Sequence, residues 1–148
     1  MWRYNITLTA TLAAVALHLS PPEATSAEAV KADSAKVGPA RVEKIDGTQL
    51  RRVTLMQKAA QRLDIRTAQV RQDPSGQKIV PHTSLLYDLA GVGWVYTNPE
   101  PLTYIRHNVV VASIKGEDAY LKDGPPAGTQ VVTMGVSELY GTEKGVGH

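Results

Sequence analysis

Three histidines and one serine are the side chains of this sequence whose type and spacing must be weighed first for chemistry. Outside the first 27 residues the histidines are His82, His107 and His148, and none stands three or four residues from another metal ligand, as paired ligands on one helix face do. His148 could hold a divalent ion through its imidazole and carboxylate, and a frayed chain end is the alternative. Ser84, in "HTSLL", lacks the G-x-S-x-G turn that exposes a nucleophile. We therefore expect no metal site and no cofactor.

The acidic residues and the overall composition also disfavour catalysis. Asp88 and Glu100 fall in expected turns, where carboxylates usually serve solvation or bond the turn backbone. Hydrolysis and group transfer need a base, a nucleophile and oxyanion donors together, and these residues do not supply that set. The absence of cysteine removes disulfides, thiolate nucleophiles and cysteine-based zinc sites. A net charge of +2 without long basic runs argues against nucleic-acid binding. We predict that the protein is not an enzyme.

The stretch "KDGPPAGTQVVTMG" (residues 122–135) has the glycine content of a phosphate-binding loop. Such a loop needs inward backbone N–H groups, a lysine after the second glycine and a helix behind it. Here Pro125 and Pro126 have no N–H group, and Gly128 is followed by threonine and a strand-like run. We therefore predict a corner between strands, in which Gly124 and Gly128 supply positive φ angles and Gly135 does so at the end of the strand.

The first 27 residues, "MWRYNITLTATLAAVALHLSPPEATSA", have the organisation of a secretory signal peptide. One early cation, Arg3, precedes an apolar run from Ile6 to Leu19, and two prolines and small residues lead to Ala27. The apolar run is shorter than the roughly 20 residues that span a bilayer. We predict cleavage near Ala27 and a periplasmic protein with a flexible leader over residues 28–40. The alternative is an uncleaved segment that anchors the chain in the inner membrane.

Short runs of β-branched and aromatic residues dominate the sequence from Gln77 onward, and glycine, proline, asparagine or aspartate separates them. They read "QKIVP", "SLLYD", "GWVYT", "TYIRHNVVVASI", "AYL" and "TQVVTMG", and are typical of β-strands joined by tight turns. Upstream, "IRTAQV" alternates as a strand does. The preceding "TLMQKAAQRL" has helical spacing, with Thr54 and Gln57 as a capping box and Asp64 at its end. We predict a mainly β fold, a small antiparallel β-meander or barrel-like domain with one short N-terminal helix.

Aromatic and cationic side chains gather on two of the expected strands. Alternation places Trp94 and Tyr96 on one face of their strand. It likewise places Tyr104, Arg106 and Asn108 on one face of the following strand. Tyrosine, tryptophan and arginine are enriched among the residues that anchor protein interfaces. Two interpretations remain open: Trp94 and Tyr96 close a core that has no phenylalanine, or the set forms an exposed partner-binding patch of Trp94, Tyr96, Tyr104 and Arg106.

The order of these motifs resembles that of periplasmic adaptor subunits, the membrane-fusion proteins of resistance-nodulation-division efflux pumps. In their C-terminal, membrane-proximal domain, a V-P-x-x-A-L segment precedes a hairpin ending in V-Y-V, and a second hairpin leads to G-L-x-x-G-x-x-V-V-x-x-G. "VTLMQKAAQRLDIRTAQV" is similar to the segment by which such adaptors enter this domain. The resemblance covers residues 53–141. The matching residues are Val80, Pro81 and Leu85; Trp94, Val95 and Tyr96; and Gly124, Pro125, Gly128, Val131, Val132 and Gly135.

Large parts of a full adaptor have no counterpart in this sequence. Adaptors insert a β-barrel, a lipoyl-like domain and a helical hairpin where this chain has only residues 71–78. The resemblance therefore implies one membrane-proximal β domain, residues 41–143, with a tail at residues 144–148. It also implies a non-catalytic exported accessory protein that docks on an inner-membrane efflux transporter or its full-length adaptor, near the membrane surface. The alternative is a stand-alone periplasmic carrier of a small ligand or a metal ion.

Overall fold

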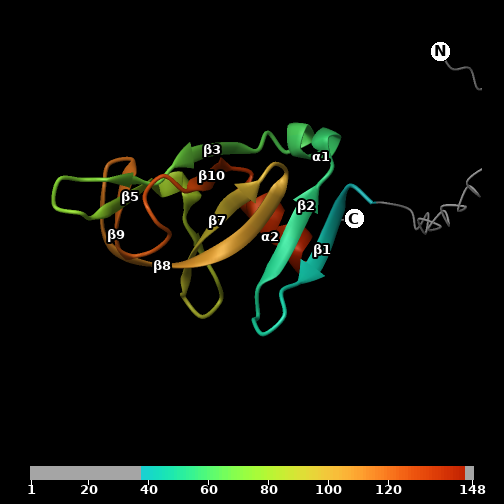
Figure 1. Cartoon of the computed structure of the whole chain (residues 1–148), viewed down its shortest axis with the longest axis horizontal. Helices are drawn as coiled ribbons and strands as arrows, with labels where there is room; N and C mark the ends of the chain where they lie inside the picture. Colours follow the sequence, from blue (N-terminus) through green and yellow to red (C-terminus); the bar gives the residue numbers. More distant parts are fainter. Residues whose placement is uncertain (1–37, 146–148) are drawn as a thin grey trace, which may run out of the picture. The chain divides into compact units, whose positions relative to one another are not determined.

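The computed structural model describes residues 38–145, which form an antiparallel sheet nearly closed into a barrel, with two α-helices (Figure 1). The predicted mainly β, barrel-like fold is confirmed. The residues predicted to form a signal peptide, most of those predicted to form the leader, and His148 lie outside the described residues. The elements are β1 (Ala40–Lys44), β2 (Arg51–Leu55), α1 (Gln57–Arg62), β3 (Arg66–Gln69), β4 (Arg71–Gln72), β5 (Lys78–Pro81), the 3-10 turn η1 (His82–Ser84), β6 (Leu86–Tyr87), β7 (Gly93–Glu100), β8 (Thr103–Lys115), β9 (Asp118–Asp123), β10 (Gln130–Met134) and α2 (Val136–Lys144).

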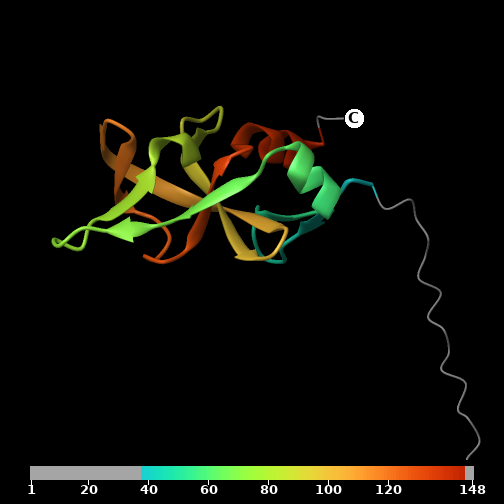
Figure 2. The same cartoon turned by 90° about the horizontal axis from the view of Figure 1, so that it is seen from above.

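The long strand β8 organises the sheet. The strands pair in the order β3-β10-β7-β8-β9-β5-β4, while β2 also pairs with β8, β1 with β2 and β6 with β7. The first part of β8 pairs with β2 and β7, and its second part pairs with β9. Its register with β9 shifts between Val110 and Ser113, and such irregularities bend a strand. Both helices lie at the end of the sheet that carries β1 and β2 (Figure 2).

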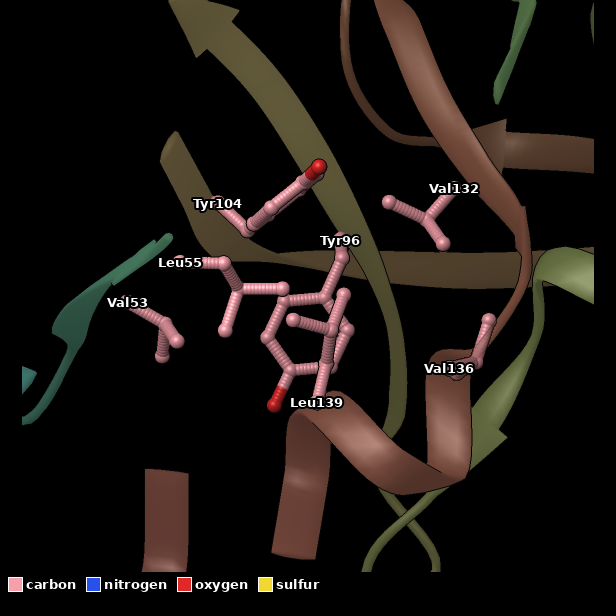
Figure 3. Close-up of a cluster of buried hydrophobic side chains, with 7 residues drawn as sticks. All are labelled: Val53, Leu55, Tyr96, Tyr104, Val132, Val136 and Leu139. Atoms are coloured by element: carbon pink, nitrogen blue, oxygen red, sulfur yellow. The ribbon is translucent and has the colours of Figure 1, made fainter. Parts of the chain in front are cut away.

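Two clusters of buried side chains make the core, and they lie on opposite faces of β7 and β10. Val95 and Tyr96 belong to different clusters, as do Val131 and Val132, because successive side chains of a strand point to opposite faces. Of the two interpretations that the sequence leaves open for Tyr96, the structure shows the core role, because Tyr96 is fully buried. The first cluster, drawn in Figure 3, is Val53, Leu55, Tyr96, Tyr104, Val132, Val136 and Leu139, and the second is Val70, Val80, Val95, Val109, Ala119, Leu121 and Val131.

The predicted N-terminal helix is present as α1, but its predicted capping box is wrong. The N-cap residue is Met56, which makes no side-chain capping bond. Thr54 lies instead in β2, where it pairs with Arg41 of β1 and with Thr103 of β8. Sheet pairing on both edges of β2 holds Thr54 in an extended conformation, so the helix can begin only after this strand ends.

The end of α1 agrees with the expectation for Asp64. This residue has a φ of 47°, the left-handed conformation that a residue with a Cβ atom adopts only at some cost. Its backbone N–H donates to the carbonyl of Gln61 at 3.1 Å. Its carboxylate accepts two hydrogen bonds from Arg66, at 3.1 and 2.9 Å. The chain thereby reverses into β3 without a glycine.

The glycine-rich stretch between β9 and α2 forms a corner followed by a strand, as predicted. Gly128 and Gly135 have φ angles of 86° and 85°, which confirms their predicted conformation. The Gly128 N–H donates to the Val70 carbonyl at 2.8 Å, so the corner is fixed to the chain that follows β3. Of the two prolines, Pro125 is buried and Pro126 is exposed.

Gly124 plays a different part from the one predicted. It is not among the residues with positive φ. A Cβ atom at this position would lie 2.8 Å from Cδ1 of Leu121 and 3.2 Å from Cγ1 of Val109. Glycine is therefore needed here because the backbone packs closely against the second cluster, and the prediction of a left-handed residue is corrected.

The helix α2 (Val136–Lys144) was not predicted from the sequence. Only one helix was predicted, and the expected boundary between residues 143 and 144 falls inside α2. Val136 and Leu139 are buried in the first cluster, and Glu143 is buried beside it. Gly145 ends the helix in a left-handed conformation, as glycine commonly does at that position. The described C-terminal region is thus part of the packed domain.

The corner offers a test of backbone strain without a packing effect, because no atom lies within 4 Å of a Cβ built on Gly128. We expect Gly128→Val to lower the free energy of unfolding by about 1 kcal/mol or more. Gly128→Asn should cost clearly less, because asparagine tolerates positive φ. Chemical denaturation of the two variants checks this, and equal losses would contradict the corner geometry.

Candidate functional site

The structure buries most of the predicted partner-binding patch. Tyr96, Tyr104 and Arg106 have exposed fractions of 0%, 4% and 6%, and Trp94 is half-buried. The expected shared face is present, since Tyr96 pairs directly with Arg106 across β7 and β8. The expectation that Tyr104 and Arg106 are exposed is wrong, because Tyr104 lies in the first cluster and Glu143 of α2 meets Arg106.

Arg106 and Glu143 form a buried ion pair between β8 and α2. The Nε of Arg106 lies 3.0 Å from Oε1 and 2.8 Å from Oε2 of Glu143. The two side chains are 7% and 1% exposed. Removing two charges from water is costly, and the cost is offset only by good geometry and further hydrogen bonds. The rest of the local structure supplies those bonds.

Two further side chains complete the bonding of Glu143. The hydroxyl of Tyr96 donates to Oε2 of Glu143 at 2.6 Å, and Nη1 of Arg51 in β2 donates to its backbone carbonyl at 2.9 Å. Burial, and then the bond to Glu143, raises the pKa of Tyr96 well above its ordinary value, so the hydroxyl stays a donor. No buried side-chain N or O atom of the described residues lacks a partner. The network ties α2 to β2, β7 and β8.

Aromatic rings cover the remaining faces of the Arg106 guanidinium. Its Cζ lies 4.6 Å from the centre of the Trp94 ring and 5.6 Å from that of Tyr140. An arginine over an aromatic face is stabilised by the ring quadrupole, by about 0.5–2 kcal/mol. Three of the predicted patch residues (Trp94, Tyr96 and Arg106) therefore do act together, but they act within the domain. Their contacts hold α2 against the sheet.

Sequence reasoning missed Glu143, although a signal for it was present. Val136, Leu139, Tyr140 and Glu143 stand at the spacing of one helix face. Gly145, just beyond them, is a typical helix stop. A carboxylate in line with an apolar stripe indicates a buried cationic partner. The pattern could not identify that partner as Arg106, which lies 37 residues away in sequence.

The loop joining β6 to β7 exposes apolar side chains and is ordered by one carboxylate. We call this loop, residues 88–92, together with Tyr87 at the end of β6, the Asp88 loop. The exposed fractions of Tyr87, Leu89 and Val92 are 51%, 106% and 37%. The Asp88 carboxylate accepts hydrogen bonds at 2.9 Å from the N–H groups of Ala90 and Val92. The loop thus presents Leu89 to solvent in one fixed conformation.

The Asp88 loop is also bonded to the buried network. The indole Nε1 of Trp94 donates to Oδ2 of Asp88 at 3.0 Å, and the same indole ring covers Arg106. The bond from Trp94, followed by that from the Val92 N–H, lowers the pKa of Asp88 below its ordinary value. The carboxylate is therefore ionised at neutral pH, the form that accepts these hydrogen bonds.

The residues considered for chemistry lie apart from one another or serve local bonds. Ser84 is fully buried, and its hydroxyl donates to the carbonyl of Pro81 at 2.8 Å. His82 begins η1 and His107 lies in β8, both exposed. Within residues 38–145, no group of three or more histidine, cysteine or acidic side chains is placed to hold a metal ion. Glu100 ends β7 and is exposed.

The buried ion pair should behave differently from an exposed one. Glu143→Ala should lower the free energy of unfolding by about 3–5 kcal/mol, because Arg106 is left buried and unpaired. The double variant Arg106→Leu with Glu143→Leu should lose less than the sum of its single changes. The pair Asp64–Arg66, with side chains 57% and 64% exposed, is the matched control. Its Asp64→Asn change should cost at most about 1 kcal/mol, and an equal cost for Glu143→Ala would contradict the network.

Protonation of the Asp88 carboxylate can be followed at the indole N–H of Trp94, which bonds it. A lowered pKa means that the stabilising charge is present at neutral pH and is lost as pH falls through a midpoint below 3.8, the ordinary aspartate value. The indole N–H resonance of Trp94 should titrate with that midpoint in an NMR experiment. The titration should vanish in Asp88→Asn and persist in Asp73→Asn. If the Trp94 indole resonance titrates in Asp88→Asn as it does in the wild type, the hydrogen bond between Trp94 and Asp88 is contradicted.

Comparison of the chain with models of protein families, with curated proteins and with solved structures finds no match. Among the described residues, no helix is both long and apolar enough to cross a bilayer.

Proposed function

We propose that this chain is a non-catalytic accessory protein of the periplasm that docks on an inner-membrane efflux transporter or on its full-length adaptor. One observation carries the proposal: the two segments that resemble adaptor sequences fold into a single sheet. The N-terminal one (residues 53–70) contributes β2, which pairs with β8, and β3, which pairs with β10. A short connection, residues 71–78, takes the place of the domains that full adaptors insert. The part that would sit on a transporter can therefore form by itself.

The Asp88 loop is the docking surface in this proposal. It exposes the apolar side chains of Tyr87, Leu89 and Val92 close together in the sequence, and exposed apolar patches often mark protein interfaces. Asp88 and Trp94 fix the loop before any partner arrives, which reduces the ordering cost of association. The loop carries one negative charge, on Asp88, and no cation. This charge favours an apolar protein pocket over an anionic lipid surface.

Cross-linking and pull-down in cells that make an efflux pump test the proposal. Affinity-tagged protein should recover the transporter or its adaptor. Tyr87→Ala with Leu89→Ala should reduce that recovery by about tenfold or more, since interface anchors commonly contribute more than 1 kcal/mol each. The matched control is Val110→Ala with Ile114→Ala, because these two side chains of β8 are each 44% exposed. Neither pair should change the melting temperature appreciably.

The two possible failures are distinguishable. Wild-type protein that recovers neither transporter nor adaptor, under conditions in which the pump assembles, would overturn the proposed function. Recovery that survives the Tyr87 and Leu89 changes as well as the control changes would leave the function standing and remove the loop as its docking surface.

A further inference from the structure

A groove with a volume of about 870 Å³ runs between the two helices, beside β1 and β2. Its size falls within the roughly 300–1,000 Å³ of sites that bind small molecules. It has no residue in common with the Asp88 loop, so it is a separate site. Its apolar lining comes from Pro39, Ala40, Val42, Leu55, Met56, Ala59 and Leu63.

The floor of the groove is apolar because the apolar side chains of α1 and the residue that follows it pack against the first cluster. Leu55 is buried in the first cluster, while Ala59 and Leu63 pack against that cluster and remain partly accessible. At the margin, Met56 and Val42 are 51% and 37% exposed. Contact with an apolar chain removes the surface of such side chains from water, which is favourable.

Charged groups stand at the two walls of the groove, and the cations are on α1. Lys58 and Arg62 are four residues apart and so lie on one face of the helix. Glu138, in the first turn of α2, lines the opposite wall. None of the three takes part in a salt bridge with another described residue. An anion is thus attracted to the α1 wall and repelled at the α2 wall.

We infer that this groove binds a single-chain anionic amphiphile such as a long-chain fatty acid, whose carboxylate lies beside Lys58 and Arg62 and whose chain covers the apolar floor. An amphipathic helix of a partner protein would have to place anions at the α1 wall and keep them away from Glu138 at the α2 wall, whereas a fatty acid carries its single anionic group at one end of an apolar chain. The inference is independent of docking on a transporter and gives a structural basis to a ligand-carrying role.

Titration with oleate tests the inference, and oleyl alcohol serves as the uncharged probe of equal chain length. The protein used should retain the residues that precede Gly38, since Gly38 itself lines the groove. Wild-type protein should bind oleate saturably and at least about fivefold more tightly than the alcohol, as expected for ion pairs at an exposed site. Lys58→Glu with Arg62→Glu should abolish this preference. Lys44→Glu with Lys122→Glu, which changes the net charge equally at exposed positions outside the groove, should preserve it.

A second variant separates occupation of the groove from general electrostatics. Ser137 is exposed and lines the α2 wall, so Ser137→Trp should obstruct the groove and weaken both probes, whereas Ser137→Ala should not. Melting temperatures of all variants should stay close to that of the wild type. Absence of saturable oleate binding, or an equal effect of the two charge-reversal pairs, would overturn the inference. A dimer that dissociates on Ser137→Trp would overturn it too, by assigning the groove to a second copy of the chain.

Discussion

The buried ion pair between Arg106 and Glu143 is the interaction on which the rest of the domain depends. Neither charge is tolerable in the interior alone, so the folded state must bring β8 and α2 together. Tyr96 and Arg51 complete the hydrogen bonds of Glu143 from two other strands. The position of α2 is thereby specified by polar contacts, and its apolar residues Val136 and Leu139 then cover the first cluster.

The same pair determines which surface remains for partners. It places Arg106, Tyr96 and one face of Trp94 within the domain, so these side chains are unavailable as interface anchors. Trp94 connects Arg106 to the Asp88 loop, because its ring covers the guanidinium and its indole N–H donates a hydrogen bond to Asp88. A continuous chain of contacts therefore links the buried carboxylate to the exposed loop that displays Leu89. These contacts restrain the loop, and a restrained loop loses less conformational entropy on binding.

The helix α2 has two roles that arise from its two faces. One face carries Val136, Leu139 and Glu143 into the core, and the other carries Ser137 and Glu138 along the groove. The groove is lined by residues of both α1 and α2, which stand at the same end of the sheet (Figure 2). Docking through the Asp88 loop and binding of an amphiphile in the groove are therefore compatible in one molecule, since they use different elements.

Local patterns in the sequence predict most of the strands from Arg66 onward, the corner before β10 and the left-handed residues Asp64, Gly128 and Gly135, because backbone preferences and the alternation of side chains are properties of neighbouring residues. Contacts between distant parts of the chain place Thr54 in a strand, require glycine at position 124 and bury Arg106. Each of these outcomes depends on residues that are far away in the sequence. Thr54 pairs with another strand, the Gly124 backbone packs closely against Val109, and Glu143 neutralises the buried Arg106. A local sequence pattern does not identify such distant partners.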